Sequence, residues 1–242
     1  MSRTVVVTGG GSGIGRVTAE RFAAAGDRVI AVGRTAERLA SLQVETRVCD
    51  VTDEEAVAAV FAELGDVDVL VNNAGMGESA PLGATTLDSW RRHIDVNASG
   101  PFLCMRAVVP GMRARGSGAV VTVASTAGRA GVPYTTAYAA SKHATVGLTR
   151  AVASEVAGTG VRVNAVCPTF VRTDMTDRSI ANIVDRTGRT PEQAEAALAA
   201  AAPLGRLLEP EEVADAIVFL ASPAAAAING QAIVIDGGGI QA

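Results

Sequence analysis

Short apolar runs rich in valine and isoleucine alternate along the chain with longer, alanine-rich stretches whose apolar residues recur at helical spacing. A short β-branched run is typical of a buried strand, and the longer stretches are typical of helices that cover a sheet. The strand-like runs lie at residues 5–7, 28–33, 45–49, 68–72, 119–124, 161–167 and 232–235. Because strands that alternate with helices form parallel sheets, the pattern predicts an α/β fold, a doubly wound parallel sheet with helices on both faces.

The first of these strands leads into a glycine-rich turn. Residues 8–15 read Thr-Gly-Gly-Gly-Ser-Gly-Ile-Gly, and residues 16–25 after them have helical spacing. Glycine lets backbone N–H groups approach a pyrophosphate, and the amino end of the following helix adds partial positive charge. Gly9, Gly13 and Gly15 follow the pattern Gly-x-x-x-Gly-x-Gly, which differs from the commoner Gly-x-Gly-x-x-Gly. A strand, this turn and a helix in succession predict a dinucleotide site.

A second signal is Lys142, the only lysine in a chain that has twenty arginines. It follows Tyr138 by four residues, which places the phenol and the ammonium on one face of a helix, one turn apart. The ammonium favours the phenolate, so we expect the pKa of Tyr138 to lie below its ordinary value of about 10. A compact ammonium also contacts a phenol and a sugar hydroxyl together better than a planar guanidinium does. Taken alone, the pair is more typical of a surface helix.

Composition narrows the classes of protein that fit. With 242 residues and 48% apolar composition, a single domain spanning residues 1–242 can bury a large core, and no linker or repeat indicates a second one. A net charge of −4 without a basic cluster argues against a nucleic-acid partner. No apolar run approaches the ~20 residues of a membrane helix, and the first residues lack a signal-peptide pattern. We therefore expect a cytoplasmic protein that does not bind a membrane.

The cysteines and histidines give no sign of a metal site. Cys49, Cys104 and Cys167 are odd in number and widely spaced, which predicts buried free thiols. His93 and His143 lack ligand-like neighbours, so we interpret both as structural or surface residues, although His143 lies beside Lys142. We expect no metal.

Several motifs occur in a fixed order: residues 8–15, Asp50-Val51, Asn72-Asn73-Ala74-Gly75, Asn97, Ser125, Tyr138 with Lys142, and Ile235-Asp236-Gly237-Gly238. Together they resemble the short-chain dehydrogenase/reductase family over essentially the whole chain. The resemblance implies an NAD(P)-dependent oxidoreductase with a seven-stranded, Rossmann-type parallel sheet and one active site per subunit. It also implies a homo-oligomer, a tetramer or a dimer, joined by long helices that would be residues 87–115 and 137–158 here.

The resemblance assigns catalytic roles to four residues. Tyr138 would be the general acid of ketone reduction, or the base of alcohol oxidation, and Ser125 would hydrogen-bond the same substrate oxygen. Lys142 would bind the nicotinamide ribose and lower the pKa of Tyr138, and Asn97 would hold a water that links Lys142 to solvent. Hydride transfer to a ketone builds negative charge on oxygen, which two converging donors stabilise.

Cofactor contacts are implied at matching positions. These are Gly9, Ser12, Gly13, Ile14, Gly15, Arg34, Asp50, Val51, Asn73, Ala74, Gly75, Tyr138, Lys142, Pro168, Val171 and Thr173. NAD-specific relatives carry an acidic residue at the end of the second strand, where it repels a 2′-phosphate, but this chain has Gly33 followed by Arg34. A guanidinium suits a phosphate, so NADP(H) is favoured over NAD(H). Thr169 replaces the glycine usual in relatives, and we expect it to narrow the pocket beside the nicotinamide.

The expected substrate pocket consists of residues 76–81, residues 126–134 and a lid at about 174–204. The lid is predicted to hold helices at residues 179–186 and 191–201, the second capped by Thr190 and Gln193. Its length and flanking pattern are similar to ketoreductases that act on 3-oxoacyl thioesters of coenzyme A or an acyl carrier. Arg129, Arg172, Arg178 and Arg189 are the candidates for contacting the phosphates of such an arm.

The leading hypothesis is an NADP(H)-dependent reductase of a small-molecule ketone, with a 3-oxoacyl thioester as the first choice. An alternative within the same chemistry is an NAD-dependent dehydrogenase of a 3-hydroxy acid, a cyclic alcohol or a sugar. A remote alternative is a nucleotide-sensing regulator without turnover, a class that typically loses the tyrosine or the lysine.

Overall fold

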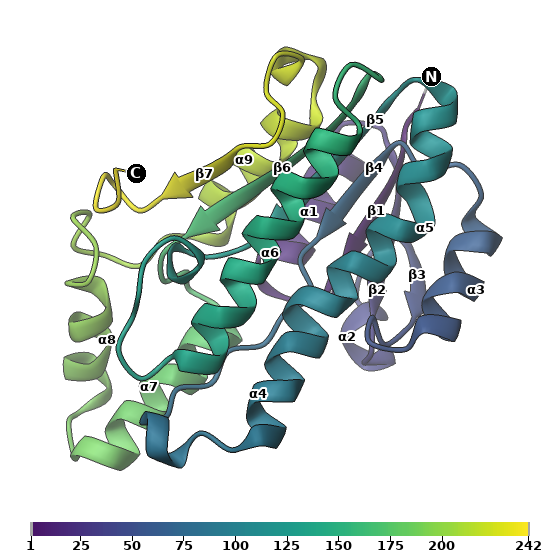
Figure 1. Ribbon diagram of the computed structural model, residues 1–242. Helices are drawn as coiled ribbons and strands as arrows, with labels where there is room; N and C mark the ends of the chain where they lie inside the picture. The colour runs from purple at the N-terminus through teal and green to yellow at the C-terminus, as the bar shows by residue number, and fades with distance from the viewer. Residues whose placement is uncertain (1, 242) are drawn as a thin grey trace.

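The computed structural model describes residues 2–241 and has a seven-stranded sheet in which every strand pairing is parallel (Figure 1). The strands are β1 (Thr4–Thr8), β2 (Arg28–Gly33), β3 (Glu45–Val48), β4 (Val69–Asn72), β5 (Gly118–Val123), β6 (Val161–Pro168) and β7 (Ala232–Ile235). Their order across the sheet is β3-β2-β1-β4-β5-β6-β7. The prediction of a doubly wound parallel sheet is confirmed, with strand limits within a few residues of the apolar runs.

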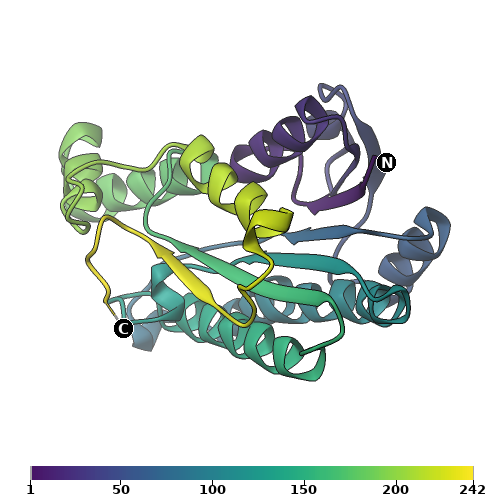
Figure 2. The same ribbon diagram turned by 90° about the horizontal axis from the view of Figure 1, so that it is seen from above.

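Helices cover both faces of this sheet. They are α1 (Gly13–Ala24), α2 (Ala36–Leu39), α3 (Glu54–Leu64), α4 (Leu87–Ile94), α5 (Gly100–Arg115), α6 (Thr136–Glu155), α7 (Asp174–Thr187), α8 (Pro191–Ala199) and α9 (Pro210–Ala221). Seen from above, α1 and α9 lie on one side of the sheet, and α5 and α6 lie on the other (Figure 2).

The core has two halves because alternate residues of a strand point to opposite faces. In β4, Leu70 packs in a cluster with residues of α3 and α5, whereas Val69 and Val71 pack in a cluster with residues of α1 and α9. All three side chains are nearly or fully buried. A strand buried on both faces must be apolar throughout, which is why the strands read as continuous valine-rich runs.

The strand order reverses at β1, which lies between β2 and β4. In open parallel sheets a ligand crevice forms at such a point, outside the carboxyl ends of the strands. The glycine turn follows β1 at this edge, and Ser125 lies just beyond the end of β5. The fold therefore brings the two main sequence signals to the same edge of the sheet.

Helices α7 and α8 form the segment that the sequence predicts to be a lid, and this segment follows the carboxyl end of β6. α7 begins at Asp174, five residues before the predicted start, because Asp174 and Asp177 lie favourably in its first turn. The predicted capping box of α8 is confirmed. The Thr190 hydroxyl accepts from the N–H of Gln193 at 3.3 Å, and the Gln193 side chain accepts from the N–H of Thr190 at 3.0 Å.

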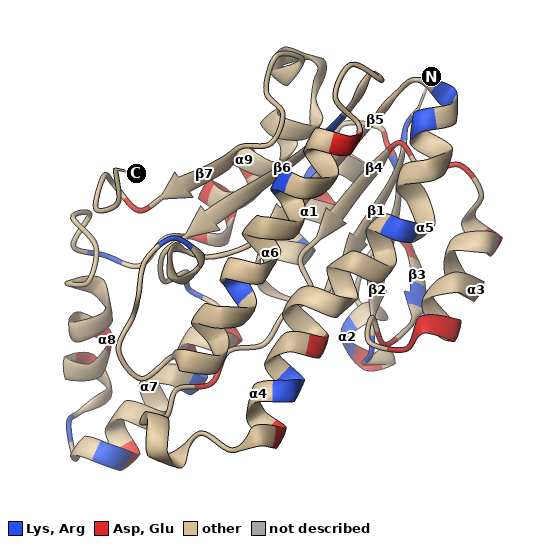
Figure 3. Cartoon of the chain, in the orientation of Figure 1, with Lys and Arg blue, Asp and Glu red and all other residues tan. Residues whose placement is uncertain are grey.

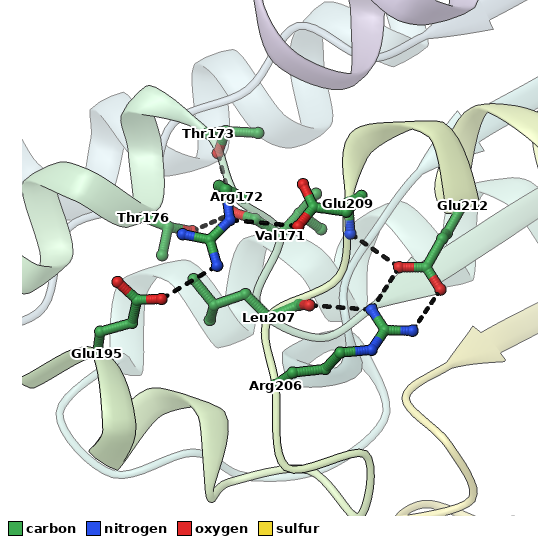
Figure 4. A network of polar contacts seen from close by, with 9 residues as sticks. All are labelled: Val171, Arg172, Thr173, Thr176, Glu195, Arg206, Leu207, Glu209 and Glu212. Atoms are coloured by element: carbon green, nitrogen blue, oxygen red, sulfur yellow. Dashed lines mark hydrogen bonds and ion pairs between the residues drawn. The ribbon is translucent and has the colours of Figure 1, made fainter. Parts of the chain in front are cut away.

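Ion pairs hold the base of the lid where the chain leaves β6 and returns to α9 (Figure 4). The guanidinium of Arg172 donates to Glu195 of α8 at 3.1 Å and to Glu209 at 3.3 Å. Glu212 accepts from Arg206 at 2.6 and 2.8 Å and from the N–H of Glu209 at 2.8 Å. Arg172 therefore links the second lid helix to the start of α9.

This link generates a prediction about lid motion. We expect Arg172→Ala to speed amide hydrogen exchange in α8 several-fold, with little change in the midpoint of global unfolding, because the ion pairs are exposed and hold only one helix. Arg189→Ala, in the loop before α8, is the matched control and should leave exchange unchanged. Equal exchange rates in α8 of the two variants would contradict this function of Arg172.

Candidate active site

The glycine turn between β1 and α1 is shaped by close contacts that only glycine permits. Gly9 has φ of 64°, and a Cβ there would lie 2.8 Å from the Cα of Ala74. A Cβ on Gly13 would lie 2.9 Å from the methyl carbon of Thr173, in the segment after β6. The side-chain amide of Asn73 donates to the carbonyls of Thr8 and Gly9 at 3.0 and 3.2 Å. These contacts hold together three of the predicted cofactor segments.

The amino end of α1 is suited to an anion. Ser12 precedes the helix in an extended conformation and makes no side-chain capping bond, and the first turn, which includes Ile14 and Gly15, contains no acidic residue. The first N–H groups of a helix lack partners within the helix and attract negative charge. The turn therefore fits the pyrophosphate of a dinucleotide.

A cleft of about 110 Å³ continues from this turn between the ends of the central strands. It is lined by Gly9, Gly33, Arg34, Cys49, Asp50, Val51, Ala74, Gly75 and Val96. Six of the predicted cofactor residues thus meet in one place. The residues present fit the adenosine end of a nicotinamide dinucleotide.

Asp50 is held as a carboxylate in this cleft. Burial acts to raise its pKa, but hydrogen bonds from the N–H and hydroxyl of Thr52, at 2.9 and 2.8 Å, and the nearby Arg34 outweigh burial, so the pKa lies below its ordinary value. Arg34 lies 3.6 Å from Asp50.

Sequence reasoning missed Arg38 of α2. Its guanidinium pairs with Asp174 at 3.1 Å, and its Cβ lies 3.0 Å from the Cβ position of Gly11 in the glycine turn. No local signal marked it, because its place depends on the path of the chain after β2. Of the predicted contacts after β6, Pro168 ends the strand beside Ile235, and Val171 forms a bridge with Leu208 at the lid base.

Tyr138 and Lys142 lie on the same side of α6, as their spacing predicts. The Lys142 Nζ is 5.8 Å from the centre of the Tyr138 ring and donates to the carbonyl of Val123 in β5 at 2.8 Å. Ser125 hydrogen-bonds Tyr138 and accepts from the N–H of Ala127 at 3.1 Å. Three predicted catalytic side chains therefore meet at the carboxyl end of β5.

The pKa of Tyr138 departs from the sequence-based expectation. Burial raises it above its ordinary value, and the opposing hydrogen bond from Ser125 is too weak to reverse the shift. Lys142 does not reverse this shift; the lysine is itself only 5% exposed, and burial lowers its own pKa to about 8. The expected acidification of Tyr138 by Lys142 is therefore wrong: the effect of burial is larger, and the buried phenol stays protonated at neutral pH.

Asn97 lies in a π-helical segment between α4 and α5 (Asp95–Ser99). Such segments frequently occur at functional sites. Its side chain exchanges hydrogen bonds with the N–H and carbonyl of Met76, both at 2.9 Å, and donates to the hydroxyl of Ser141 at 2.9 Å. Its backbone carbonyl accepts from Thr145 at 2.7 Å. Asn97 thus ties the segment after β4 to α6.

Gly75 is the point where the cofactor cleft meets the catalytic residues. A Cβ on Gly75 would lie 3.2 Å from the side-chain oxygen of Asn97 and 3.6 Å from the Nζ of Lys142. A side chain here would fill the space between the cleft and the lysine. The small residue keeps that space open.

His93 borders the site, which its sequence context did not indicate. It is 1% exposed, and its ring lies edge-on to that of Tyr138 with 6.4 Å between ring centres. Its Nε2 accepts from the N–H of Glu78 at 3.1 Å, so its Nδ1 donates to the carbonyl of Ser89 at 2.7 Å. Both ring nitrogens have partners, which makes His93 a structural residue behind Tyr138.

A larger cleft, about 480 Å³, opens beside Tyr138. It is lined by Met76, Gly77, Glu78, Ser79, Ala80, Ala84, Thr85, Thr86, Ser89, Arg92, His93, Tyr134, Thr136, Ala137, Arg178, Ser179, Asn182 and Arg186. A Cβ on Gly77 would lie 3.3 Å from both the Tyr138 ring and the sulfur of Met175. The cleft volume is typical of small-molecule sites.

The lining agrees only in part with the expected pocket. The segment 76–80 and α7 contribute as predicted, but Tyr134 alone represents the segment 126–134, and the contribution of α4 was missed. Tyr134 is the one non-glycine residue within 2–241 with positive φ, 64°, at the cleft wall. Helix α4 was missed because its sequence gives no sign that the chain folds it against α6, at the edge of the cleft.

The four arginines proposed for phosphate contacts have different surroundings in the structure. Arg129 donates to the carbonyl of Ala232 at 3.3 Å, and Arg172 is paired with two glutamates. Arg189 does not line the cleft, whereas Arg178 does. Only Arg178 remains in position for the role that the sequence suggested.

The thiols and other possible ligands take no part in a metal site within the described residues. Cys49, Cys104 and Cys167 are buried and free, and burial raises the pKa of Cys104 to about 12. Residues 2–241 contain no cluster of three or more histidine, cysteine or acidic side chains arranged for a metal ion. In the same range, none of the helices has the length and apolar character required to span a membrane.

The buried lysine generates a prediction about stability and pH. Between pH 8, the approximate pKa of Lys142 in the folded protein, and its ordinary value of 10.5, the unfolded chain binds more protons at this lysine than the folded chain does. The lysine therefore makes the free energy of unfolding rise with pH across this range. We expect Lys142→Met to be stabilised relative to the wild type near neutral pH and to lose that advantage as pH rises through 8. Denaturant unfolding across this range measures the difference, and a difference that does not vary with pH would contradict the assigned shift.

Comparison with known proteins places this site in a family. A family model described as enoyl-(acyl carrier protein) reductase matches residues 9–239. The chain is 40% identical to a 3-oxoacyl-(acyl carrier protein) reductase of Thermotoga maritima, over 98% of this chain and 97% of the relative. It is also 40% identical to a cis-4-hydroxycyclohexanecarboxylate dehydrogenase of Sinomonas cyclohexanicum, over 98% and 96%.

Solved structures agree with this. A variant of actinorhodin polyketide ketoreductase with NADPH matches with a TM-score of 0.91 and 38% identity, over 98% of this chain and 97% of that one. ElxO with bound NADP matches with a TM-score of 0.88 and 31% identity, over 99% of each chain. The chain belongs to the short-chain dehydrogenase/reductase family, and it is an NAD(P)-dependent oxidoreductase that acts on alcohol or ketone groups.

Proposed function

We propose that this enzyme is an NADP(H)-dependent ketone reductase whose substrate is a 3-oxoacyl thioester. The observation that carries the proposal is the meeting of Tyr138, Ser125 and Lys142 at the carboxyl end of β5, next to a glycine turn suited to a dinucleotide. A regulator without turnover would have no need for this arrangement.

In the proposed mechanism, the ketone oxygen lies between the hydroxyls of Ser125 and Tyr138. The bound cofactor supplies the hydride. As negative charge develops on the oxygen, Ser125 donates a hydrogen bond to it and Tyr138 transfers its proton to it. Tyr138 is protonated when the substrate arrives, as a donor in the reductive direction must be, because burial keeps its pKa above the ordinary value.

Lys142 and Asn97 have supporting roles in this proposal. Lys142 is buried beside Tyr138, where its ammonium stabilises the phenolate left after proton transfer and binds the nicotinamide ribose when the cofactor is present. Asn97 fixes the segment after β4 against α6 through Met76 and Ser141. As the family resemblance implies, the proposal also includes a water molecule next to Asn97. Lys142 exchanges protons with solvent through this water.

The NADP(H) preference rests on the charges around the adenosine cleft. β2 ends in Gly33 instead of an acidic residue, and the only carboxylate in the cleft lining, Asp50, is paired with Arg34. Arg38 adds a second arginine, whose Cβ lies beside Gly11 of the glycine turn. Both arginines have exposed side chains that can turn toward a 2′-phosphate. Solved relatives with bound NADPH and NADP agree with this preference.

The thioester is favoured by the volume of the cleft beside Tyr138, about 480 Å³, and by the relative named as a 3-oxoacyl-(acyl carrier protein) reductase. The relative that acts on a hydroxycyclohexanecarboxylate supports a second candidate, a dehydrogenase of a cyclic alcohol. Turnover of both substrate types, followed by nicotinamide absorbance, distinguishes the two.

Removal of the proton donor tests the catalytic assignment. We expect Tyr138→Phe to lower kcat by about 10²–10⁴-fold, the usual contribution of general acid catalysis, while the dissociation constant of NADPH changes little. Nicotinamide absorbance measures turnover, and fluorescence titration measures NADPH binding. Turnover of Tyr138→Phe at the wild-type rate would rule out this residue as the acid.

Cofactor choice is tested at the two ends of β2. We expect kcat/KM with NADPH to exceed that with NADH by about tenfold or more, the equivalent of one charge-assisted hydrogen bond. Arg34→Ala should reduce this ratio to near one. Arg28→Ala, at the opposite end of the same strand, is the control and should leave it unchanged. A preference for NADH in the unaltered enzyme would refute the assignment.

A further inference from the structure

One face of the lid helix α7 turns hydrogen-bond donors toward the cleft beside Tyr138. Arg178, Asn182 and Arg186 follow one another at intervals of four residues, which places them on the same face of a helix. All three line the cleft, and Arg92 of α4 lines it as well. Figure 3 shows basic positions on both helices.

The one carboxylate that lines the cleft is already paired with protein groups. Glu78 is the only carboxylate among the lining residues, and it accepts from the guanidinium of Arg92 at 3.2 Å and from the hydroxyl of Ser89 at 3.1 Å. Arg178 has no ion-pair partner within residues 2–241. The cleft therefore carries a local positive charge in a chain whose net charge is −4.

Arg186 is oriented by a neutral partner. Its Nε donates to the side-chain oxygen of Asn182 at 2.7 Å, and the Asn182 amide donates to the hydroxyl of Ser79 at 3.0 Å, on the opposite wall. This arrangement fixes the guanidinium without neutralising it. Arg172 at the lid base differs, because two glutamates neutralise it.

We propose that Arg178 and Arg186 form a subsite for an anionic group on the substrate, a carboxylate or a phosphate, and so select charged ketones over neutral ones. The inference rests on the proposed reductase function and adds the charge of its substrate. A guanidinium binds either group through paired hydrogen bonds.

Arg178 and Arg186 lie at different distances from Tyr138 along α7, so each suits a substrate of a different length. Met175 marks the end of the helix near Tyr138, since its sulfur lies 3.3 Å from the Cβ position of Gly77, next to the tyrosine ring. At a rise of about 1.5 Å per residue, Arg178 lies roughly 4–5 Å along the helix from Met175, and Arg186 roughly 16 Å. Arg178 therefore suits the carboxylate of a compact keto acid, and Arg186 suits the phosphate of a long thioester arm.

Matched substrates that differ in charge test the subsite. The thioester pair is acetoacetyl coenzyme A and its uncharged N-acetylcysteamine analogue, and the acid pair is a cyclic keto acid and its methyl ester. Dissociation constants are measured by calorimetry on Tyr138→Phe saturated with NADP⁺, so that the result does not require turnover. We expect the charged member of at least one pair to bind about tenfold or more tightly, the equivalent of one charge-assisted hydrogen bond.

Added substitutions identify the residue. Arg178→Met should remove the advantage of the keto acid, Arg186→Met should remove that of the coenzyme A thioester, and Arg189→Met, elsewhere on the lid, should remove neither. Loss in only one pair tells which source of the anion the site takes. Equal binding of charged and uncharged members, equal weakening of both by the variants, or no binding of either pair would overturn the subsite.

The same experiments separate this inference from the proposed function. If charge selectivity is present and depends on these arginines while the unaltered enzyme reduces none of the four compounds, the reductase proposal fails and the subsite stands. If the enzyme reduces charged and uncharged members with equal kcat/KM and binds them equally, the reductase proposal stands and the subsite fails.

Discussion

The close contact of α6 with the carboxyl end of β5 determines where every candidate catalytic group lies. The ammonium of Lys142 donates to the carbonyl of Val123 at 2.8 Å, inside the protein. A Cβ on Gly128 would lie 2.7 Å from the carbonyl oxygen of Lys142, so only glycine lets the turn after Ser125 approach the helix so closely. This contact fixes the rotation of α6, which directs Tyr138 toward Ser125 and the adjoining cleft.

That same contact sets the electrostatics of the site. Burial raises the pKa of Tyr138 and lowers that of Lys142 to about 8, because removal from water disfavours both charged forms. Desolvation therefore outweighs the attraction between ammonium and phenolate. A tyrosine in its acid form is ready to donate a proton, which agrees with the reductive direction of the proposed reaction.

The arginines of the lid fall into two groups, those paired with glutamates at its base and those without an acidic partner in the cleft. At its base, Arg172 and Arg206 are neutralised by glutamates, and Arg172 attaches α8 to the start of α9. In the cleft, Arg178 has no acidic partner among the described residues and Arg186 is held by an amide. Ion pairs at the base give the lid its position, and the guanidiniums left over in the cleft are available to a ligand.

Much of this protein is determined by local sequence patterns. Valine-rich runs specify strands buried on both faces, and Gly9 and Gly13 specify a turn that a side chain would block. The four-residue spacing places Tyr138 and Lys142 on one helix face, and the Thr190 capping box specifies the start of α8. These features depend on backbone geometry and periodicity. Both act over a few neighbouring residues, so they can be predicted from the sequence alone.

Other features were decided only by tertiary structure. Whether Lys142 or burial controls the pKa of Tyr138 depends on the depth of the pair, which no spacing encodes. Contacts between segments far apart in the chain decide three further features. They place His93 behind the tyrosine, bring α4 to the cleft, and divide the arginines into those with and those without an acidic partner. Desolvation and charge pairing depend on three-dimensional neighbours, so they become defined only when the chain has folded.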